Sequence, residues 1–430
     1  MVKIKELNMS KKQEFCFAHF TDIHIGTSVN PAMTAANLTW ALSEIETFSP
    51  KPEVIICSGD SVCDGTREEL VEFKNLMNTS SVPWHALPAN HDLWGEENDK
   101  VWQEVIGPMR KSVVVGNFKF LMWNDIKRVG NGWTTVISDE EFNWLETELA
   151  DAEKRDLNVI AAIHNPMDKR NNYTSHCTRW TNADTDKVMN LFAKYGVKAM
   201  ISGDYHVNDC WEINGVTNIN SSSLAGFIWN GQDNFPVKPG YRLFYWDGEV
   251  LRTFWRQGSY WNLPGSEEKK QRYCWSWELY HFREACNKFW PIMHYERAQV
   301  SLTAIGGVWT GGARPVFRKM HVFDKTTLQV QSFSQLLNVE KISWSLNEND
   351  WRPMTKVWNG IWDEWEAEFD PDEFRGGEYL LKVMAETDAG AKFYDTVPVV
   401  LCGPRNAPRG TAPVIAGGLE VRQAFRIPFD

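Results

Sequence analysis

Short apolar runs alternate with longer amphipathic stretches from residue 15 to about residue 260. The apolar runs predict β-strands at Phe15–Phe20, Val54–Cys57, Trp84–Leu87, Phe118–Trp123, Asn158–Ile163 and Lys198–Ile201. The amphipathic stretches predict helices at Ala35–Phe48, Thr66–Leu76, Ser138–Lys154 and Asp184–Tyr195. Ser138 and Glu141 have the spacing of a capping box at the start of the third helix. Strands that alternate with helices are typical of βαβ units, so this part predicts a layered α/β fold.

The pattern changes to short strands alone from about residue 298 to residue 401. Residues 345–350 predict a turn between the strands Lys341–Trp344 and Trp351–Met354. Residues 376–385 begin with two glycines and continue with the period of two that a half-buried strand shows. Short strands separated by regular turns predict an all-β domain, a β-sandwich of immunoglobulin-like type.

These changes predict the domain organisation. The predicted parts are an N-terminal extension at 1–14, the α/β domain at 15–262, an aromatic connecting segment at 263–297, the β-sandwich domain at 298–403 and an extended C-terminal tail at 404–430. A chain of 430 residues is longer than one hydrophobic core normally serves, which agrees with more than one domain.

Composition narrows the class of protein. A hydrophobic content of 43% is that of a foldable globular chain. The net charge of −11 argues against a protein that coats long nucleic acid, because binding to phosphate backbones needs a basic face. The eight cysteines form no C-x-x-C pair and lie mostly in apolar surroundings, so we interpret them as reduced core thiols.

The sequence shows no export or membrane signal. The first twelve residues contain four lysines and no apolar stretch of the kind a signal peptide has. No window approaches the roughly 20 apolar residues that span a bilayer. The chain as given is therefore expected to be cytoplasmic, although a secreted chain trimmed of its signal peptide would look the same.

Polar residues of the kinds that bind metals follow most of the predicted strands of the α/β part. The five polar ends are Asp22-Ile23-His24, Gly59-Asp60, Asn90-His91-Asp92, His164-Asn165 and Asp204-Tyr205-His206. The loops at the carboxyl ends of strands converge on one crevice in layered α/β folds, so these side chains are expected to meet. Alternation of side chains along a strand would let Asp22 and His24 face the same point.

Each polar end has an ordinary explanation when it is taken alone. Asp60 could cap a turn, Asn90 could be a turn residue, and His164 could be a buried structural histidine. Taken together, the five ends would require the same accident five times. The series therefore favours a metal site over five separate structural roles.

The order and spacing of these residues resemble the calcineurin-like metallophosphoesterases, whose pattern reads D-x-H, G-D, G-N-H-D or G-N-H-E, H, and G-H-x-H. The resemblance covers about residues 15 to 260, a little over half of the chain. It implies an α/β fold in which a layered metallophosphoesterase β-sandwich is flanked by helices. The Asn-His-Asp form is similar to the class III cyclic-nucleotide phosphodiesterase-like branch and to the glycerophosphodiester branch.

The resemblance also implies the roles of the residues. One metal would be held by Asp22, His24, Asp60 and His206, and a second by Asp60, Asn90, His164 and Asp204. Asp60 would bridge the two ions, and His91 would be the catalytic residue that contacts the phosphoryl group. Two divalent or trivalent ions about 3.5–4 Å apart can share a hydroxide that attacks phosphorus. The mixture of carboxylate, imidazole and amide ligands suits Mn, Fe or Zn.

Two positions depart from the family pattern. Ala89 stands where the family has glycine, which requires either an ordinary backbone conformation or strain. Asp204 stands where the family has a histidine ligand of the second metal. An aspartate there could bind that metal and favour the harder cations Mn or Fe, or it could point away and leave the second site weak or empty.

The loop that follows His164 is a candidate substrate-binding region. Arg170, Arg179 and Tyr173 in this loop could contact phosphate and an organic group, and Trp94 could form a second wall. A solvated surface loop is the alternative. The chain has 22 tryptophans, which we interpret as core and interdomain packing rather than as stacking platforms for sugars or bases.

Three functions are consistent with these residues. The first is metal-dependent hydrolysis of phosphate esters, with phosphodiesters slightly preferred and a small phosphorylated compound as substrate. The second is hydrolysis of a related ester, such as a phosphomonoester, a sulfate ester or a phosphonate ester. The third is a binding protein that has lost catalysis and recognises its partner through the β-sandwich. The sequence leaves the oligomeric state open.

Overall fold

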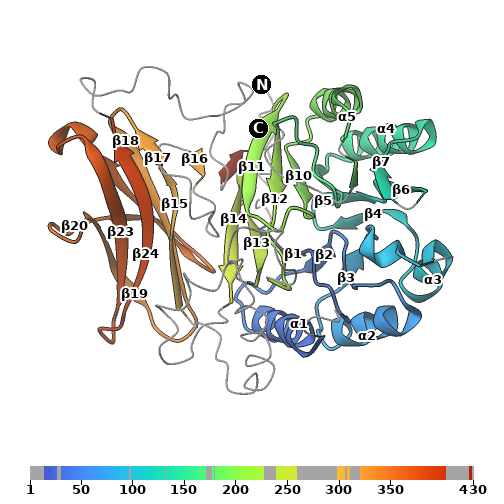
Figure 1. The fold of residues 1–430 in the computed structure, drawn as a ribbon, viewed down its shortest axis with the longest axis horizontal. Coiled ribbons are helices and arrows are strands. Elements are labelled where there is room, and N and C mark those ends of the chain that lie inside the picture. The colour runs from blue at the N-terminus through green and yellow to red at the C-terminus, as the bar shows by residue number, and fades with distance from the viewer. Residues whose placement is uncertain are drawn as a thin grey trace, which may run out of the picture.

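Two stacked β-sheets with helices on their outer faces form the first part of the molecule, and an all-β part follows (Figure 1). The computed structural model describes residues 14–26, 31–95, 98–130, 132–170, 177–178, 180–226, 239–258, 298–305, 308–309, 320–402 and 426–428. This arrangement confirms the predicted fold class, a layered α/β sandwich followed by an all-β region. The immunoglobulin-like type of that region and the domain boundaries remain predictions.

The first sheet carries three of the polar strand ends, which follow its parallel strands. Its order is β25 (Arg426–Pro428), β14 (Val250–Gln257), β13 (Gly240–Trp246), β1 (Phe15–Phe20), β2 (Val54–Cys57) and β3 (Trp84–Ala86). Strands β1, β2 and β3 are parallel, whereas β13 runs antiparallel to β1. Helices α1 (Pro31–Ile45) and α2 (Arg67–Met77) cover its outer face, where Leu42, Phe73 and Phe20 belong to one buried cluster. Helix α3 (Asn98–Val105) packs beside α2 and was not predicted.

The second sheet carries the remaining strand ends. Its order is β11 (Asp209–Ile213), β12 (Val216–Asn220), β10 (Ala199–Ser202), β8 (Asn158–Ala162), β5 (Phe118–Trp123) and β4 (Arg110–Val115). Helices α4 (Asp139–Lys154) and α5 (Asn182–Lys194) cover its outer face. Ser138 accepts a hydrogen bond from the backbone of Glu141 in a complete capping box, which confirms the predicted start of α4. A small sheet of β6 (Ile126–Val129), β7 (Gly132–Thr135) and β9 (Cys177–Thr178) lies to one side.

An aromatic core joins the inner faces of the two sheets. Phe17 of β1 stacks on Phe244 of β13 at 4.5 Å between ring centroids and meets Phe120 of β5 edge-on at 5.0 Å. Strands covered on both faces read as continuous apolar runs, which is why β1, β2 and β5 were predicted with their observed bounds.

The all-β part consists of two five-stranded sheets. One has the order β16 (Val308–Trp309), β15 (Ala298–Ile305), β18 (Thr326–Ser334), β22 (Asp363–Phe369) and β21 (Thr355–Asn359). The other has the order β17 (Met320–Val322), β24 (Lys392–Leu401), β23 (Gly377–Thr387), β19 (Val339–Leu346) and β20 (Arg352–Pro353). One buried cluster, including Leu328, Trp344 and Val383, lies between them. The predicted turn at 345–350 connects β19 to β20.

Strand β14 forms the interface between the two parts, which we call the seam. Phe254 stacks on Trp362 with ring centroids 5.3 Å apart. Arg252 Nη1 lies 2.8 Å from Glu364 Oε2, and Gln331 Nε2 donates to the carbonyl of Thr253. Both charged partners in this seam are largely buried, so the all-β part is held on the first sheet by packing and by polar contacts.

Two further predictions concern segments at the margins of the description. The aromatic connecting segment lies outside the described residues, as does most of the predicted tail. Within the tail, Arg426–Pro428 pairs antiparallel with β14. No helix in the described ranges combines the length and apolar character that crossing a membrane requires.

Candidate metal centre

The polar strand ends meet at one edge of the two stacked sheets, and an unusual backbone conformation brings them there. Positive φ angles occur at Asp22 (52°), His24 (51°), Asp60 (48°), Asp204 (66°) and His206 (53°). Left-handed conformations are uncommon outside glycine, and each costs on the order of 1–3 kcal/mol unless its surroundings enforce it. Asp22 and His24 lie beyond the end of β1, so this left-handed turn, and not the strand alternation that we expected, aims both side chains at one point.

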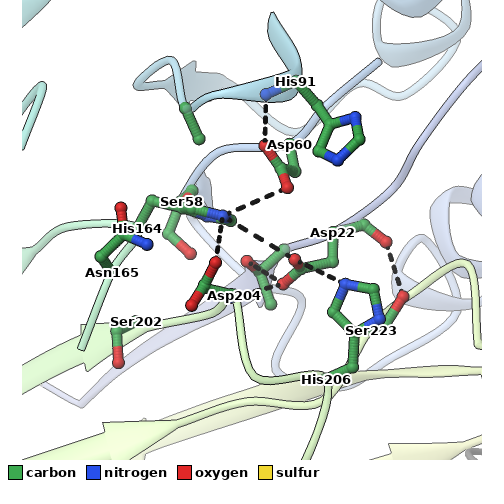
Figure 2. A network of polar contacts seen from close by, with 12 residues as sticks. Asp22, Ser58, Asp60, His91, His164, Asn165, Ser202, Asp204, His206 and Ser223 are labelled. Atoms are coloured by element: carbon green, nitrogen blue, oxygen red, sulfur yellow. Dashed lines mark hydrogen bonds and ion pairs between the residues drawn. The ribbon is translucent and has the colours of Figure 1, made fainter. Parts of the chain in front are cut away.

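The first group of ligand atoms is formed by Asp22, His24 and His206, whose ligand atoms lie within 4.8 Å of one another. Asp22 Oδ1 is 3.0 Å from His206 Nε2 and 3.9 Å from His24 Nε2 (Figure 2). The other oxygen of Asp22 accepts hydrogen bonds from the Thr21 hydroxyl and from the Asp204 backbone. Asp22 therefore presents one oxygen to the two histidines.

The second group is formed by Asp60, His164 and the same Asp22. His164 Nε2 is 3.2 Å from Asp60 Oδ2 and 3.9 Å from Asp22 Oδ1. Asp204 Oδ1 lies 3.8 Å from the same nitrogen, so its carboxylate faces the group and does not point away (Figure 2). Asp22 and Asp60 thus lie between the histidines of both groups.

Hydrogen bonds orient His164 towards this space. Its Nδ1 donates to the carbonyl of Ser58 at 2.8 Å, which leaves Nε2 as the nitrogen that faces the carboxylates. His164 Nε2 and Asp22 Oδ1 are buried, and neither has a well-aligned hydrogen-bond partner among the described residues, although Asp60 and His206 lie close to them. Buried polar atoms normally have such partners, and a metal-binding histidine is usually fixed through its second nitrogen in this way. The donor set therefore fits bound cations.

The charges in the site lead to the same interpretation. Burial by itself would lower the pKa of His164, but three neighbouring carboxylates, Asp60 foremost, raise it well above the usual histidine value. Burial also lowers the pKa of His24 well below that value. Negative charge is thus concentrated on a buried set of carboxylates, and such groups are stable only when they are paired or coordinate a metal.

His91 lies beside both groups with its position fixed from two sides. Its backbone N–H donates to Asp60 Oδ1 at 3.1 Å, and its Nδ1 donates to the carbonyl of Cys63 at 2.6 Å. The half-exposed ring of Trp94 stacks on His91 with centroids 5.3 Å apart. Asn90 is buried directly before His91, at the start of the short 3₁₀ helix His91–Leu93.

The backbone around Ala89 is ordinary, which resolves the alternative between relaxed and strained conformations. Ala89 is not among the described residues with positive φ, and its N–H donates to Asp92 Oδ2 at 2.9 Å. Asp92 also accepts from the backbones of Ser61 and Val62. This buried carboxylate, to which we assigned no role from the sequence, therefore ties the Asp60 loop to the His91 loop.

A second buried carboxylate was also missed. Asp125 accepts hydrogen bonds from the backbone N–H groups of His164 and Asn165 at 3.2 and 3.0 Å. Burial raises the pKa of Asp125 to about 7. It lies two residues after the end of β5, so the rule that identified the other polar strand ends could also have identified this positioning residue.

A buried polar network lies behind Ser58. His19 Nε2 contacts the Ser58 hydroxyl at 2.8 Å, and His19 Nδ1 contacts the Ser221 hydroxyl at 3.0 Å. Arg242 Nε donates to the same Ser221 hydroxyl at 2.9 Å. No sequence signal separates His19 from an ordinary residue of β1, because it lies inside the strand and not at its end.

The predicted substrate residues have different outcomes. Arg170 is paired with Asp168 and Asp209 at 2.8 Å and lies over the ring of Trp211, so its contacts indicate a structural role and lend no support to phosphate binding. Trp94 is 47% exposed next to His91, which suits the predicted wall. Tyr173 and Arg179 lie outside the described residues.

Comparison with known proteins agrees with this geometry. Residues 16–208 match the family model of the calcineurin-like phosphoesterases. The chain is 23% identical over 249 residues to a 3′,5′-cyclic-nucleotide phosphodiesterase of Nostoc sp., which covers 56% of this chain and 91% of that protein. It is 29% identical over 154 residues to a probable glycerophosphodiester phosphodiesterase of Arcobacter nitrofigilis, covering 34% of this chain and 55% of that protein.

A solved structure also aligns with part of the chain. A dimetal phosphatase from Danio rerio aligns with a TM-score of 0.46 and 12% identity, over 56% of this chain and 96% of that one. The family match begins inside β1 and ends two residues after His206, so it includes all five polar strand ends. The chain therefore contains a calcineurin-like phosphoesterase domain at residues 16–208, which identifies it as a hydrolase of ester bonds.

Proposed function

We propose that this protein is a phosphodiesterase whose site holds two metal ions. The observation that carries the proposal is that two buried groups of ligand atoms share Asp22, and that Asp60 of the second group also lies close to a histidine of the first. Asp22, His24, Asp60 and His206 would hold one ion, and Asp60, Asn90, His164 and Asp204 would hold the other. When bound, such a pair of cations lowers the pKa of water and neutralises charge on phosphoryl oxygens.

Asp60 is the proposed bridging ligand. Its Oδ2 lies 3.8 Å from His24 Nε2 and 3.2 Å from His164 Nε2, so one oxygen reaches a histidine of each group. Asp22 Oδ1 lies closest to His206, on the side of the first ion. Asp60 also holds the backbone of His91, which couples the bridge to the proposed catalytic residue.

His91 is the residue that we assign to the leaving group. Its Nδ1 is engaged by the Cys63 carbonyl, so Nε2 is the nitrogen that can donate to a phosphoryl or leaving oxygen. The stacked Trp94 covers one face of the ring and restricts its rotation. A fixed imidazole needs no reorganisation when charge develops on the leaving oxygen, which is the condition for effective stabilisation.

Asp204 favours a diester over a monoester. A monoester carries a charge of about −1.5 to −2 at neutral pH, whereas a diester carries −1. The extra carboxylate at position 204 repels the more highly charged substrate more strongly. The same carboxylate favours Mn or Fe over Zn, because harder cations prefer oxygen ligands. The names of the two related phosphodiesterases support this substrate class.

A sulfate monoester is a second candidate substrate. It carries a single negative charge, so the argument from Asp204 admits it as readily as a phosphodiester. The comparison of chromogenic phosphodiester, phosphomonoester and sulfate ester substrates separates these alternatives.

The test measures bound metal and hydrolysis for four proteins. Wild-type protein and Asp60→Asn, Asp204→His and Asp372→Asn are stripped of metal, reloaded with Mn, Fe or Zn, and assayed on the three substrates. Asp372 is an exposed aspartate of the all-β part, so it controls for the chemical change alone. Asp60→Asn is expected to bind fewer ions and to lose at least about 10²-fold in kcat/KM, since bound ions supply several kcal/mol.

Asp204→His is expected to retain two ions, to shift preference towards Zn and to raise the monoester rate relative to the diester rate. No turnover of any ester with any metal would refute the enzyme. Two bound ions and full activity in Asp60→Asn would refute the bridge. An unaltered substrate ratio and metal preference in Asp204→His would refute the role of Asp204.

A further inference from the structure

A third group of metal-type ligands lies next to the proposed catalytic site. His24, Cys63 and His91 place ligand atoms within 4.8 Å of one another. Cys63 is 7% exposed and is a thiol, not half of a disulfide. Neither the proposed mechanism nor the family pattern gives its side chain a role.

The backbone holds these three residues in place. The N–H of Cys63 donates to the carbonyl of Ile25 at 2.9 Å, directly beside His24. The carbonyl of Cys63 accepts from His91 Nδ1 at 2.6 Å. The rings of His24 and His91 meet edge-to-face with centroids 4.9 Å apart. The thiol therefore lies between two segments that are each fixed by the main chain.

The chemistry of this group differs from that of the two carboxylate-rich groups. One thiolate and two imidazoles are a soft donor set, and with a water molecule they complete the tetrahedral coordination that Zn²⁺ prefers. Binding requires the thiol to release its proton to solvent. Mn²⁺ gains little from a sulfur ligand, so the group discriminates between the cation proposed for catalysis and a thiophilic one.

We propose that His24, Cys63 and His91 form an inhibitory site for a thiophilic divalent cation such as Zn²⁺. Occupation of this site would draw His24 away from the first ion and would engage His91, the residue assigned to the leaving group. The existence of the site does not depend on the proposed function, but the inhibition does. Binding and inhibition are therefore measured separately.

The binding experiment uses Cd²⁺ as the probe, because a cadmium–thiolate bond has an ultraviolet charge-transfer band. Metal-free wild-type protein, Cys63→Ser and Cys402→Ser are titrated with Cd²⁺. Cys402 is the matched control, because its Sγ lies 3.5 Å from a single histidine nitrogen, that of His321. Wild type and Cys402→Ser are expected to show a charge-transfer band that Cys63→Ser lacks. The affinity for Cd²⁺ is expected to be at least about tenfold weaker in Cys63→Ser, because removing even an outer partner of a metal ligand lowers metal affinity 10–100-fold.

Thermal unfolding and circular dichroism establish that each variant is folded. Should Cys63→Ser not fold, His91→Gln tests the same site, and it is expected to weaken Cd²⁺ binding by a similar factor. A Cd²⁺ titration of Cys63→Ser, or of His91→Gln, that matches wild type would overturn the site, whether or not the protein hydrolyses any ester.

The inhibition experiment starts from protein loaded with Mn²⁺ and hydrolysing a chromogenic phosphodiester. Added Zn²⁺ is expected to reduce the rate of wild type and of Cys402→Ser, and the half-inhibitory concentration is expected to rise at least about tenfold in Cys63→Ser. Each variant is compared with its own rate before Zn²⁺ is added. Equal inhibition of Cys63→Ser and wild type would overturn the inhibitory role, even if Cd²⁺ binds.

Discussion

The left-handed backbone conformation of five proposed ligands directs their oxygens and nitrogens towards the candidate metal centre before any cation binds. Asp22, His24, Asp60, Asp204 and His206 share this conformation. Hydrogen bonds from the main chain and from neighbouring side chains hold them, as those of Thr21 and Asp204 do for Asp22. The strain is thus sustained by the surrounding fold, and a bound ion would meet a site that needs little rearrangement.

At the scale of single residues, His19 makes the stability of the protein depend on pH. Burial lowers the pKa of His19 from its ordinary value to about 3. Above pH 6.5 the residue is neutral in both states, and between about pH 6.5 and 3 only the unfolded chain binds the proton. The unfolded state is therefore favoured on acidification, and stability falls with pH by up to about 1.4 kcal/mol per pH unit from this residue.

The measurement is the free energy of unfolding in urea between pH 7 and pH 4.5, for wild type and His19→Gln. The variant has no titrating group at this position, so its free energy of unfolding is expected to fall less steeply with pH in this range. The difference in slope is expected to correspond to close to one bound proton. Parallel curves for the two proteins would show that His19 is already charged in the folded state.

At the scale of elements, Gly59 joins β2 to the loop that carries Asp60. Its φ is +100°, and a Cβ there would lie 2.7 Å from Ala89 Cβ and 2.8 Å from His164 Nδ1. Gly196 after α5 also has a positive φ, of +68°, but a Cβ there would meet nothing within 4 Å. Alanine substitution at the two positions therefore separates the stability lost through backbone strain from the stability lost through steric clashes.

Gly196→Ala is expected to lose about 1 kcal/mol of stability from its backbone conformation alone. Gly59→Ala is expected to lose more, and also to lose bound metal, because the methyl group pushes the loop of Ala89 or the ring of His164 out of place. Chemical denaturation and metal content measure both effects. Equal losses in the two variants, with metal content unchanged, would contradict this account.

The element scale also shows which features the sequence could predict. Strands β1, β2 and β5 are buried throughout and mostly apolar, and were located from pattern alone. Strand β12 was not, because Asn218 and Asn220 are buried polar residues that break the apolar pattern and form hydrogen bonds within the fold. A pattern argument treats such residues as exposed.

The candidate site divides in the same way. Its proposed ligands could be named from the sequence because each follows an apolar run. Asp92 and His19 act through contacts between segments distant in sequence, which spacing does not reveal. The pairing of Arg170 with Asp209 is a contact of this kind too, and no pattern in the sequence indicates it.

At the scale of the whole molecule, the seam at β14 makes the two parts unfold together. Trp362 is buried against Phe254 and belongs to the core cluster of the first sheet. Trp362→Ala is expected to cost about 3–5 kcal/mol and to separate one cooperative thermal transition into two. Trp351, which meets Tyr394 on the other sheet of the all-β part, provides the control substitution.

Scanning calorimetry distinguishes the outcomes. Trp351→Ala is expected to leave a single transition at a slightly lower temperature. A single, unshifted transition in Trp362→Ala would show that the parts are coupled through other contacts, whereas two transitions already in the wild type would show that they unfold independently.

Because Arg426–Pro428 pairs with β14, the first sheet is completed only after this late segment has been synthesised. Ribosomes add about 5–20 residues per second, and domains begin to fold as they emerge. Strands β1, β2, β13 and β14 are all synthesised before the all-β part, but the outer neighbour of β14 comes after it. During translation of the intervening residues, β14 therefore has an open edge, which other chains can pair with. The last described strand closes that edge only after the all-β part has been synthesised.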